Sequence, residues 1–285
     1  MPEGDTIHRL AGRVERAVAG QVCDRCVTRD PRLVGVDLVG ATLVNAVAVG
    51  KHLLVRFIGP GTLARTLHIH LGMDGRVMIV GQVRGAAWRR RIELGFGEVT
   101  LVGLDLPVVQ VIPTAAEDTV VGHLGPDVST GVRDREPASL AERLRIDPLV
   151  PLAGALLDQR NLAGLGNVFA VEVPFIAGVD PHQPVGSIDA LERVVDVAAA
   201  LIGWSTANGV RNTTGRRLHT SDHWIYGRGG LPCPLCGTRL RSESAEASPW
   251  RRLTVWCPTC QRAAARVAID PRRIARLLRM HPAWR

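Results

Sequence analysis

Four cysteines near the carboxyl end of the chain have the spacing of metal ligands. They form two Cys-x-x-Cys pairs separated by twenty residues, Cys233 with Cys236 and Cys257 with Cys260. Each pair places two thiolates on one tight turn, and four thiolates around one ion give the closed shell of structural zinc. We therefore predict one structural zinc ion, which cannot activate water because protein ligands fill every position. Disulfides and an iron–sulfur cluster are the alternatives.

The amino terminus reads Met-Pro-Glu-Gly and offers a second kind of chemistry. If Met1 is removed, Pro2 becomes the terminal residue and carries a secondary amine, with the carboxyl group of Glu3 beside it. A structural interpretation is also open, because proline and acidic residues both suit the first turn of a helix.

Lysine usage singles out one further position. Of the 35 basic residues, 34 are arginine, and Lys51 is the single lysine. An ammonium group can give up a proton, whereas a guanidinium effectively cannot. This difference predicts a catalytic or phosphate-contacting role for Lys51, with chance retention as the alternative.

The composition sets the class of protein. The chain has 285 residues, of which 46% are hydrophobic, so it can bury a sizeable core over two domains. The net charge of +8 is concentrated in residues 211–285, where 15 arginines face four acidic residues. Such a basic region fits a polyanionic partner, and a solvated arginine-rich surface is the alternative. Without an apolar run of about 18 residues or a signal peptide, we expect a cytoplasmic protein.

Hydrophobic periodicity predicts an amino-terminal helix followed by strands. Within residues 3–19, apolar side chains recur at spacings of three and four. Short Val- and Leu-rich runs punctuated by glycine then continue to about residue 112, which predicts a sandwich or barrel. The clearest of these runs are residues 41–49, 51–58, 62–71 and 97–106.

The second half is expected to be helical and then basic. The polar stretch after Gly125-Pro126 predicts a domain boundary near residues 130–145. Residues 149–208 are helical in character, and Ser187 is the expected cap of their last helix. Segments 238–243 and 251–256 predict the two strands of a zinc ribbon, and an amphipathic helix is expected in the tail. Cys23 and Cys26 lack a second pair, so small buried cysteines are a better interpretation than redox chemistry.

A glycine-flanked turn precedes one of the predicted helices. Gly164 and Gly166 bracket the turn, and Asn167 opens the helix. Exposed N–H groups at a helix amino terminus bind phosphate, and an asparagine side chain sharpens such a site. A simple helical packing unit would explain the glycines but not the polar residues Gln159, Arg160, Asn161 and Asn167.

These segments, taken in order, resemble the formamidopyrimidine-DNA glycosylase / endonuclease VIII family of bifunctional base-excision repair enzymes. The resemblance covers residues 1–261 and lies in Pro-Glu-Gly at the start, GKHLL around Lys51, HLGMDGR at 70–76, DQRNLAGLGN at 158–167, and the cysteine-containing segment 226–261. It implies a β-sandwich preceded by a helix, a helix–two-turn–helix domain and a zinc finger, with DNA bound in the cleft between the lobes.

The resemblance also implies catalytic roles. The amine of Pro2 would attack C1′ of a damaged nucleoside and displace the base. Glu3 would protonate the sugar ring oxygen as a general acid, and Lys51 would approach the phosphate or the sugar. Arg252 matches the finger arginine that grips the phosphate and supports a second, δ elimination.

DNA contacts are implied at two further places. Asn167, next to Gly166, matches the asparagine that contacts the DNA backbone. The loop from His70 to Met73 is the one that family members use to fill the gap left by the flipped nucleotide, with Met73 as the apolar wedge.

Some residues depart from the family pattern. Thr6 stands where the family usually has an acidic residue, which puts a proton-relay role there in doubt. Members specialised for oxidised guanine carry an Asp-x-Arg-Arg-Phe-Gly segment that residues 101–112 lack. Together with Pro-Glu-Gly at the start, this favours the endonuclease VIII branch, whose preferred lesions are oxidised pyrimidines. The tail after Gln261 extends beyond the usual end of the family.

We therefore predict an α+β protein that binds double-stranded DNA containing damaged bases or abasic sites. The expected parts are a catalytic sandwich domain at 1–135, a helical DNA-binding domain at 145–222, a zinc ribbon at 223–262 and a basic tail at 263–285. The expected function is a DNA glycosylase with abasic-site lyase activity, acting as a nucleoid-associated monomer. An enzyme that acts only on abasic sites and an inactive damaged-DNA-binding protein are the alternatives.

Overall fold

A computed structural model describes residues 2–59, 62–129, 136–215, 222–279 and 281–282. The chain forms two compact units, Met1–His123 and Leu124–Arg285. This division lies upstream of the boundary predicted near residues 130–145. The segment after His123 belongs to the second unit because its backbone bonds there: Gly125 N donates to Gln159 O, and Ala163 N donates to Pro126 O. The finer division into helical domain, ribbon and tail stays a prediction.

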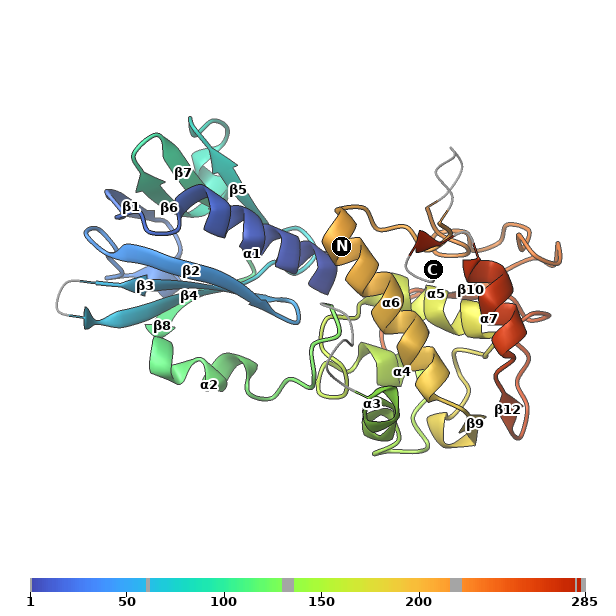
Figure 1. The fold of residues 1–285 in the computed structure, drawn as a ribbon. Helices are drawn as coiled ribbons and strands as arrows, with labels where there is room; N and C mark the ends of the chain where they lie inside the picture. Colours follow the sequence, from blue (N-terminus) through green and yellow to red (C-terminus); the bar gives the residue numbers. More distant parts are fainter. Residues whose placement is uncertain (1, 60–61, 130–135, 216–221, 280, 283–285) are drawn as a thin grey trace. The chain divides into compact units, whose positions relative to one another are not determined.

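The first unit is a β-sandwich with one long helix, as predicted (Figure 1). Each of its two sheets has four antiparallel strands. One sheet has the order β1 (Arg25–Thr28), β6 (Arg90–Phe96), β7 (Val99–Leu104) and β5 (Arg76–Val80). The other has the order β2 (Thr42–Val49), β3 (His52–Ile58), β4 (Ala64–His70) and β8 (Val108–Pro113). A short helix, α2 (Asp118–Val121), follows β8.

Helix α1 (Gly4–Val18) forms because its apolar residues recur on one face, and that face is buried against strands of both sheets. Ile7, Leu10, Val14 and Val18 join the strand residues in a single hydrophobic core. The N–H of Gly20, just past the helix, donates to Leu43 O at the start of β2 (2.8 Å). The opposite end of α1, where the chain begins, therefore lies toward the far end of β2.

The second unit is helical around one fully buried helix. All eleven residues of α5 (Asn167–Ala177) are buried, so this helix forms the centre of the core. Around it lie α3 (Pro137–Leu144), α4 (Leu152–Leu157), α6 (Glu192–Asn208) and α7 (Pro271–Leu278), the last being the amphipathic tail helix that was predicted. Two short sheets complete it: β10 (Arg241–Glu243) with β11 (Thr254–Trp256), and β9 (Ile188–Asp189) with β12 (Val267–Ala268).

The predicted cap of α6 was wrong. The helix begins at Glu192, and Ser187 lies in a 3₁₀ turn over Val185–Ser187. Its hydroxyl donates to Pro184 O (2.7 Å), so the side chain stabilises this turn instead of a helix end. A serine hydroxyl bonds equally well to either kind of local backbone, which is why the sequence alone misplaced it.

One buried carboxylate joins α5 to a distant stretch of chain. Glu172 has no exposed surface, and its oxygens accept from Trp224 N (2.7 Å), Ile225 N (2.8 Å) and Tyr226 N (2.8 Å). The hydroxyl of Thr213 donates to the same group. Four donors satisfy the charge, and in return the carboxylate fixes the backbone at both ends of residues 213–226.

We predict that Glu172→Ala destabilises the second unit by about 3 kcal/mol, because it leaves three buried N–H groups without an acceptor. Thermal unfolding followed by tryptophan emission measures the change. Glu142→Ala on α3, where the side chain is exposed, is the matched control and should leave the melting temperature unchanged. Equal melting temperatures for both variants would contradict the proposed anchoring role.

Candidate functional site

The predicted nucleophile and its acid lie at the start of α1. Glu3 is the residue that caps the helix, and its carbonyl accepts from Thr6 N (2.9 Å) and Ile7 N (3.2 Å). Its side chain is fully buried, while Pro2 is half-buried. The helix amino terminus carries a partial positive charge, which stabilises a carboxylate held there. The first residues are therefore an ordered part of the fold.

Asp5 organises the same first turn. Its carboxylate is buried and accepts from the backbone N–H of Thr6 (2.7 Å) and from the Thr6 hydroxyl (3.2 Å). Arg9, one turn later, forms an ion pair with it at 3.5 Å. Thr6, where the family pattern has an acidic residue, thus serves as a donor to Asp5.

Lys51 lies in the tight turn between β2 and β3. Gly50 enters this turn with φ = +58°, a backbone conformation that glycine adopts without cost. Because α1 ends beside the start of β2, its amino-terminal end points toward this turn, and Figure 1 shows both on one side of the first unit. The fold thus brings Lys51 to the end of the sandwich where Pro2 and Glu3 lie.

His70 and Met73 lie at that same end. His70 is the last residue of β4 and pairs with His52, the residue after Lys51. The following turn presents Met73, which is 70% exposed. Gly72 has φ = +59°, and a Cβ there would stand 2.6 Å from Pro107 Cγ, so only glycine fits.

Next to Lys51 the structure reveals a histidine cluster that the sequence analysis missed. The rings of His52 and His68 stack with centroids 5.0 Å apart, and those of His70 and His123 approach His52 edge-on. Gln110 Nε2 donates to His68 Nδ1 (3.1 Å), so the proton of His68 lies on Nε2 and is donated to His52 Nδ1 (2.8 Å). His68 and His70 are two residues apart in β4 and so lie on the same face of the sheet. This spacing is visible in the sequence and could have indicated the cluster.

Burial keeps His52, His68 and His70 of this cluster uncharged. It lowers the pKa of His52 to about 3 and that of His68 to about 4, and the neighbouring His70 acts in the same direction. The pKa of His70 is also lowered, by burial and then by the charge of Lys51. Lys51 is therefore the cation beside a group of neutral imidazoles at neutral pH.

In the second unit, Asn167 connects two of the predicted DNA-binding elements. It is the first residue of α5 after the cap Gly166, and it is 4% exposed. Its Nδ2 donates to Leu253 O (2.9 Å), one residue past Arg252, while no described residue donates to its buried Oδ1. Arg252 itself is exposed on the turn that precedes β11. Asn167 thus supports the segment that presents Arg252.

The four predicted ligand cysteines come together in the second unit. Their sulfur atoms all lie within 4.8 Å of one another, and the four thiols form no disulfide. The N–H groups of Leu235 and Cys260 point at the sulfurs of Cys233 (3.5 Å) and Cys257 (3.4 Å), as donors around a metal thiolate do. Four convergent sulfurs supply the donor set of a metal ion, and the two predicted ribbon strands are β10 and β11.

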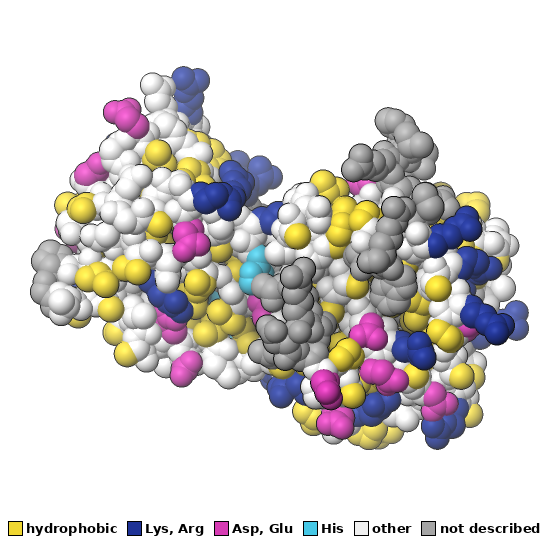
Figure 2. All heavy atoms as spheres, in the orientation of Figure 1, with side chains coloured by type: hydrophobic (Ala, Val, Ile, Leu, Met, Phe, Trp, Pro, Cys, Tyr) yellow, Lys and Arg dark blue, Asp and Glu magenta, His cyan; other side chains and the backbone are white. Residues whose placement is uncertain are grey.

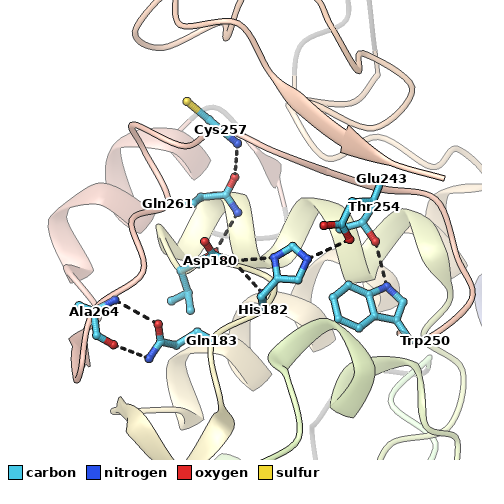
Figure 3. A network of polar contacts seen from close by, with 10 residues as sticks. Asp180, His182, Gln183, Glu243, Trp250, Thr254, Cys257, Gln261 and Ala264 are labelled. Carbon is cyan, nitrogen blue, oxygen red and sulfur yellow. Dashed lines mark hydrogen bonds and ion pairs between the residues drawn. The ribbon is translucent and has the colours of Figure 1, made fainter. Parts of the chain in front are cut away.

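The ribbon is fastened to the helical part through residues 179–183 (Figure 3). Gln261 accepts from the N–H of Cys257 and donates to Val179 O, both at 2.9 Å. His182 bonds to Asp180 (2.9 Å) and to Glu243 on β10 (3.0 Å). These two acids, Asp180 first, raise the pKa of His182.

Two further sequence predictions concern the basic tail and the two cysteines outside the cluster. Arginine side chains gather over α7 in the second unit (Figure 2), a helix that carries Arg272, Arg273 and Arg276. Burial raises the pKa of Cys23 to about 11, and it also raises the pKa of Cys26. Both therefore remain protonated thiols at neutral pH, which supports a packing role over redox chemistry.

Known proteins resemble this chain over nearly its whole length. A family model described as formamidopyrimidine-DNA glycosylase N-terminal domain matches residues 1–105. A probable endonuclease 8 2 of Streptomyces coelicolor is 42% identical, covering 96% of this chain and 100% of the relative. The DNA-(apurinic or apyrimidinic site) lyase Nei2 of Mycolicibacterium smegmatis is 38% identical, covering 93% and 100%.

A solved structure shows the same fold. The Lactococcus lactis Fpg in complex with DNA containing an abasic site matches with a TM-score of 0.74 and 19% identity, over 92% of this chain and 100% of that one. Within the described residues, no helix has the length and apolar character that crossing a membrane requires.

We predict opposite pH dependences for two histidine variants. His68 is neutral in the folded state but binds a proton below about pH 6.5 when unfolded, so it costs about 1 kcal/mol of stability per pH unit as the pH falls from 6.5 toward 4. His182 has a raised folded pKa, so its contribution is present at low pH and is lost as the pH rises through that value.

Melting temperatures between pH 5 and 8 check this. His68→Gln should lose less stability on acidification than the unaltered protein, whereas the deficit of His182→Gln should be larger at pH 5.5 than at pH 8. Deficits with the same pH dependence in both variants would contradict the assignment.

Proposed function

The chain belongs to the formamidopyrimidine-DNA glycosylase / endonuclease VIII family, and we propose that it excises oxidised bases and cleaves abasic sites through its amino-terminal proline. The observation that carries this proposal is the placement of Pro2 beside the buried Glu3, at the end of the sandwich where Lys51 lies. A terminal amine, a carboxyl group and an ammonium are the groups that such a reaction needs.

The reaction begins with attack of the Pro2 amine on C1′, which forms a C–N bond as the bond to the base breaks. Glu3 protonates the ring oxygen as the sugar opens, and the secondary amine becomes an iminium cation. The iminium draws electrons from C2′, so loss of the C2′ proton expels the 3′ phosphate. Water then hydrolyses the iminium and regenerates the amine.

The remaining residues would hold the DNA. Lys51 supplies a positive charge and a proton near the reacting sugar or its phosphate. The neutral histidines beside it add no second positive charge. Arg252 would grip a phosphate on a turn that Asn167 supports, and His70 and Met73 would contact the DNA at the displaced nucleotide. Gly166 allows the backbone before α5 to approach a phosphate.

We propose zinc as the ion held by the four cysteines, since four thiolates at short mutual distance favour zinc in tetrahedral geometry. The ion would hold the β10–β11 hairpin in shape and take no part in the reaction. We also propose a monomer acting on DNA in the cytoplasm, with the sandwich, the helical domain and the ribbon as its functional parts.

Oxidised pyrimidines are the proposed lesions, because two relatives, at 42% and 36% identity, are named endonuclease 8. In addition, only three residues join β7 and β8, where members specialised for oxidised guanine carry the Asp-x-Arg-Arg-Phe-Gly segment. A second candidate is an enzyme restricted to abasic sites. It is favoured by one relative that is named a DNA-(apurinic or apyrimidinic site) lyase.

We predict that borohydride traps a covalent adduct between abasic-site DNA and Pro2, since reduction converts the iminium to a stable amine. Peptide mass mapping locates the adduct. The same protein with Met1 retained should form none and should not cleave. Failure of the correctly processed, folded protein to form an adduct at residue 2 would overturn the mechanism.

Duplexes that each carry a single lesion then separate the two candidates. Cleavage of duplexes with an oxidised pyrimidine supports the glycosylase, and cleavage confined to abasic duplexes selects the lyase.

We predict that chelation, or Cys257→Ser, abolishes DNA binding while the sandwich stays folded, because the hairpin that carries Arg252 loses its metal support. Metal analysis, DNA binding and limited proteolysis report the three effects. Cys26→Ser, outside the cluster, is the control and should retain both metal and binding. Retained binding after verified metal loss would refute the coupling between metal and DNA.

A further inference from the structure

Strand register brings two connecting segments of the first unit, and the end of a third, to one end of the sandwich. Arg76 and Arg90 both pair with Leu104, on opposite sides of β7. The turn at residues 71–75 leads into Arg76, the segment 81–89 leads into Arg90, and residues 105–107 follow Leu104. His70 and Val108 pair in the other sheet at this same end. The turn 71–75, residues 105–107 and the end of the segment 81–89 therefore lie where Lys51, His70 and Met73 lie.

These segments contact one another. Gly72 packs against Pro107, close enough that a Cβ there would overlap the ring. Asp105 N donates to Arg89 O (2.8 Å), and Arg89 Nε donates to the Asp105 carboxylate (2.7 Å). The turn of Met73 is thus joined through residues 105–107 to the segment that ends at Arg89.

That segment presents an exposed tryptophan on a fixed backbone. Trp88 lies in a 3₁₀ turn over Ala87–Arg89, and 75% of its surface is exposed. The carbonyl of Trp88 accepts from Arg91 Nη1 (2.9 Å), and the Arg89 guanidinium carbon lies 6.0 Å from the ring centroid. Among the described residues the other tryptophans, Trp204, Trp224, Trp250 and Trp256, are buried or half-buried. A large apolar ring held out into solvent gains no stability from folding, so its burial against a bound partner would favour binding.

The surroundings of Trp88 are cationic. A hydrogen bond from Arg89 lowers the pKa of Asp105, and the charges of Arg91 and Arg76 act in the same direction. Three guanidinium groups therefore stand around one carboxylate, and Figure 2 shows Lys and Arg side chains gathered near β5. An aromatic ring among arginines suits nucleic acid, whose phosphates match the charge and whose bases match the ring.

We propose that Trp88 is a DNA-contacting residue whose indole stacks on a nucleobase at the lesion, next to the place taken by Met73. The inference rests on the proposed function, because it takes damaged duplex DNA as the partner. The base opposite an abasic site has lost its pairing partner and offers an uncovered face for stacking. The neighbouring connection between β7 and β8, residues 105–107, is short and has no aromatic side chain. It therefore cannot supply a stacking contact itself.

The test uses a duplex with a tetrahydrofuran abasic analogue opposite 2-aminopurine, whose fluorescence falls when it is stacked. Trp88→Ala should raise the Kd by about tenfold, in line with the loss of one base–aromatic contact, and should change the 2-aminopurine emission of the complex. Trp88→Phe, which keeps a ring, should restore most of both signals. Ile58→Ala removes an exposed apolar side chain at the other end of β3 and should change neither.

The outcomes are distinct. Unchanged affinity and emission in Trp88→Ala overturn the stacking role, and so does an equal loss in Ile58→Ala. An indole that serves a protein partner instead would give this unchanged result. If the unaltered protein neither binds this duplex nor cleaves a duplex with a natural abasic site, the proposed function fails and the inference fails with it.

Discussion

A nucleophile at the very end of a chain requires that the end be held still. Chain termini usually fray, because few contacts tie them down. Here the second and third residues enter a helix whose apolar face is buried against both sheets, and the carbonyl of Glu3 accepts the first two N–H bonds of that helix. The amine that we propose as the nucleophile is therefore held in position by the packing of Ile7, Leu10 and Val14. The sandwich holds the amine in the way that a rigid scaffold usually holds an internal side chain.

In the second unit, the hairpin that carries Arg252 must likewise be held in place. A hairpin of two three-residue strands has too little core to keep its shape, so it depends on the cysteine cluster at its base and on fasteners to the helices. Asn167, Gln261 and His182 attach it at three separate points. Each attachment is a single hydrogen-bonding side chain, and together they make the hairpin part of the helical core.

The sequence predicted the elements whose signals are local and strong. Helical spacing located α1, alternating Val and Leu located the strands, and cysteine spacing located the ribbon. What escaped prediction depends on contacts between distant residues. Sheet register brings together the cluster histidines of β3 and β4, and the path of the chain after α2 adds His123. The misplaced cap at Ser187 and the unforeseen anchor at Glu172 have the same origin, because a hydroxyl or carboxylate accepts whichever partner the tertiary fold supplies.

The single lysine limits which groups of this protein can react as amines. Once Met1 is removed, the chain contains only two aliphatic amines, the terminal nitrogen of Pro2 and Nζ of Lys51, and both lie at one end of the sandwich. Guanidinium groups are poor nucleophiles because they stay protonated. Any amine-selective reagent, natural aldehyde or acylating metabolite is therefore directed to this one region. An arginine-rich composition thus leaves the rest of the surface without an aliphatic amine that such reagents could modify.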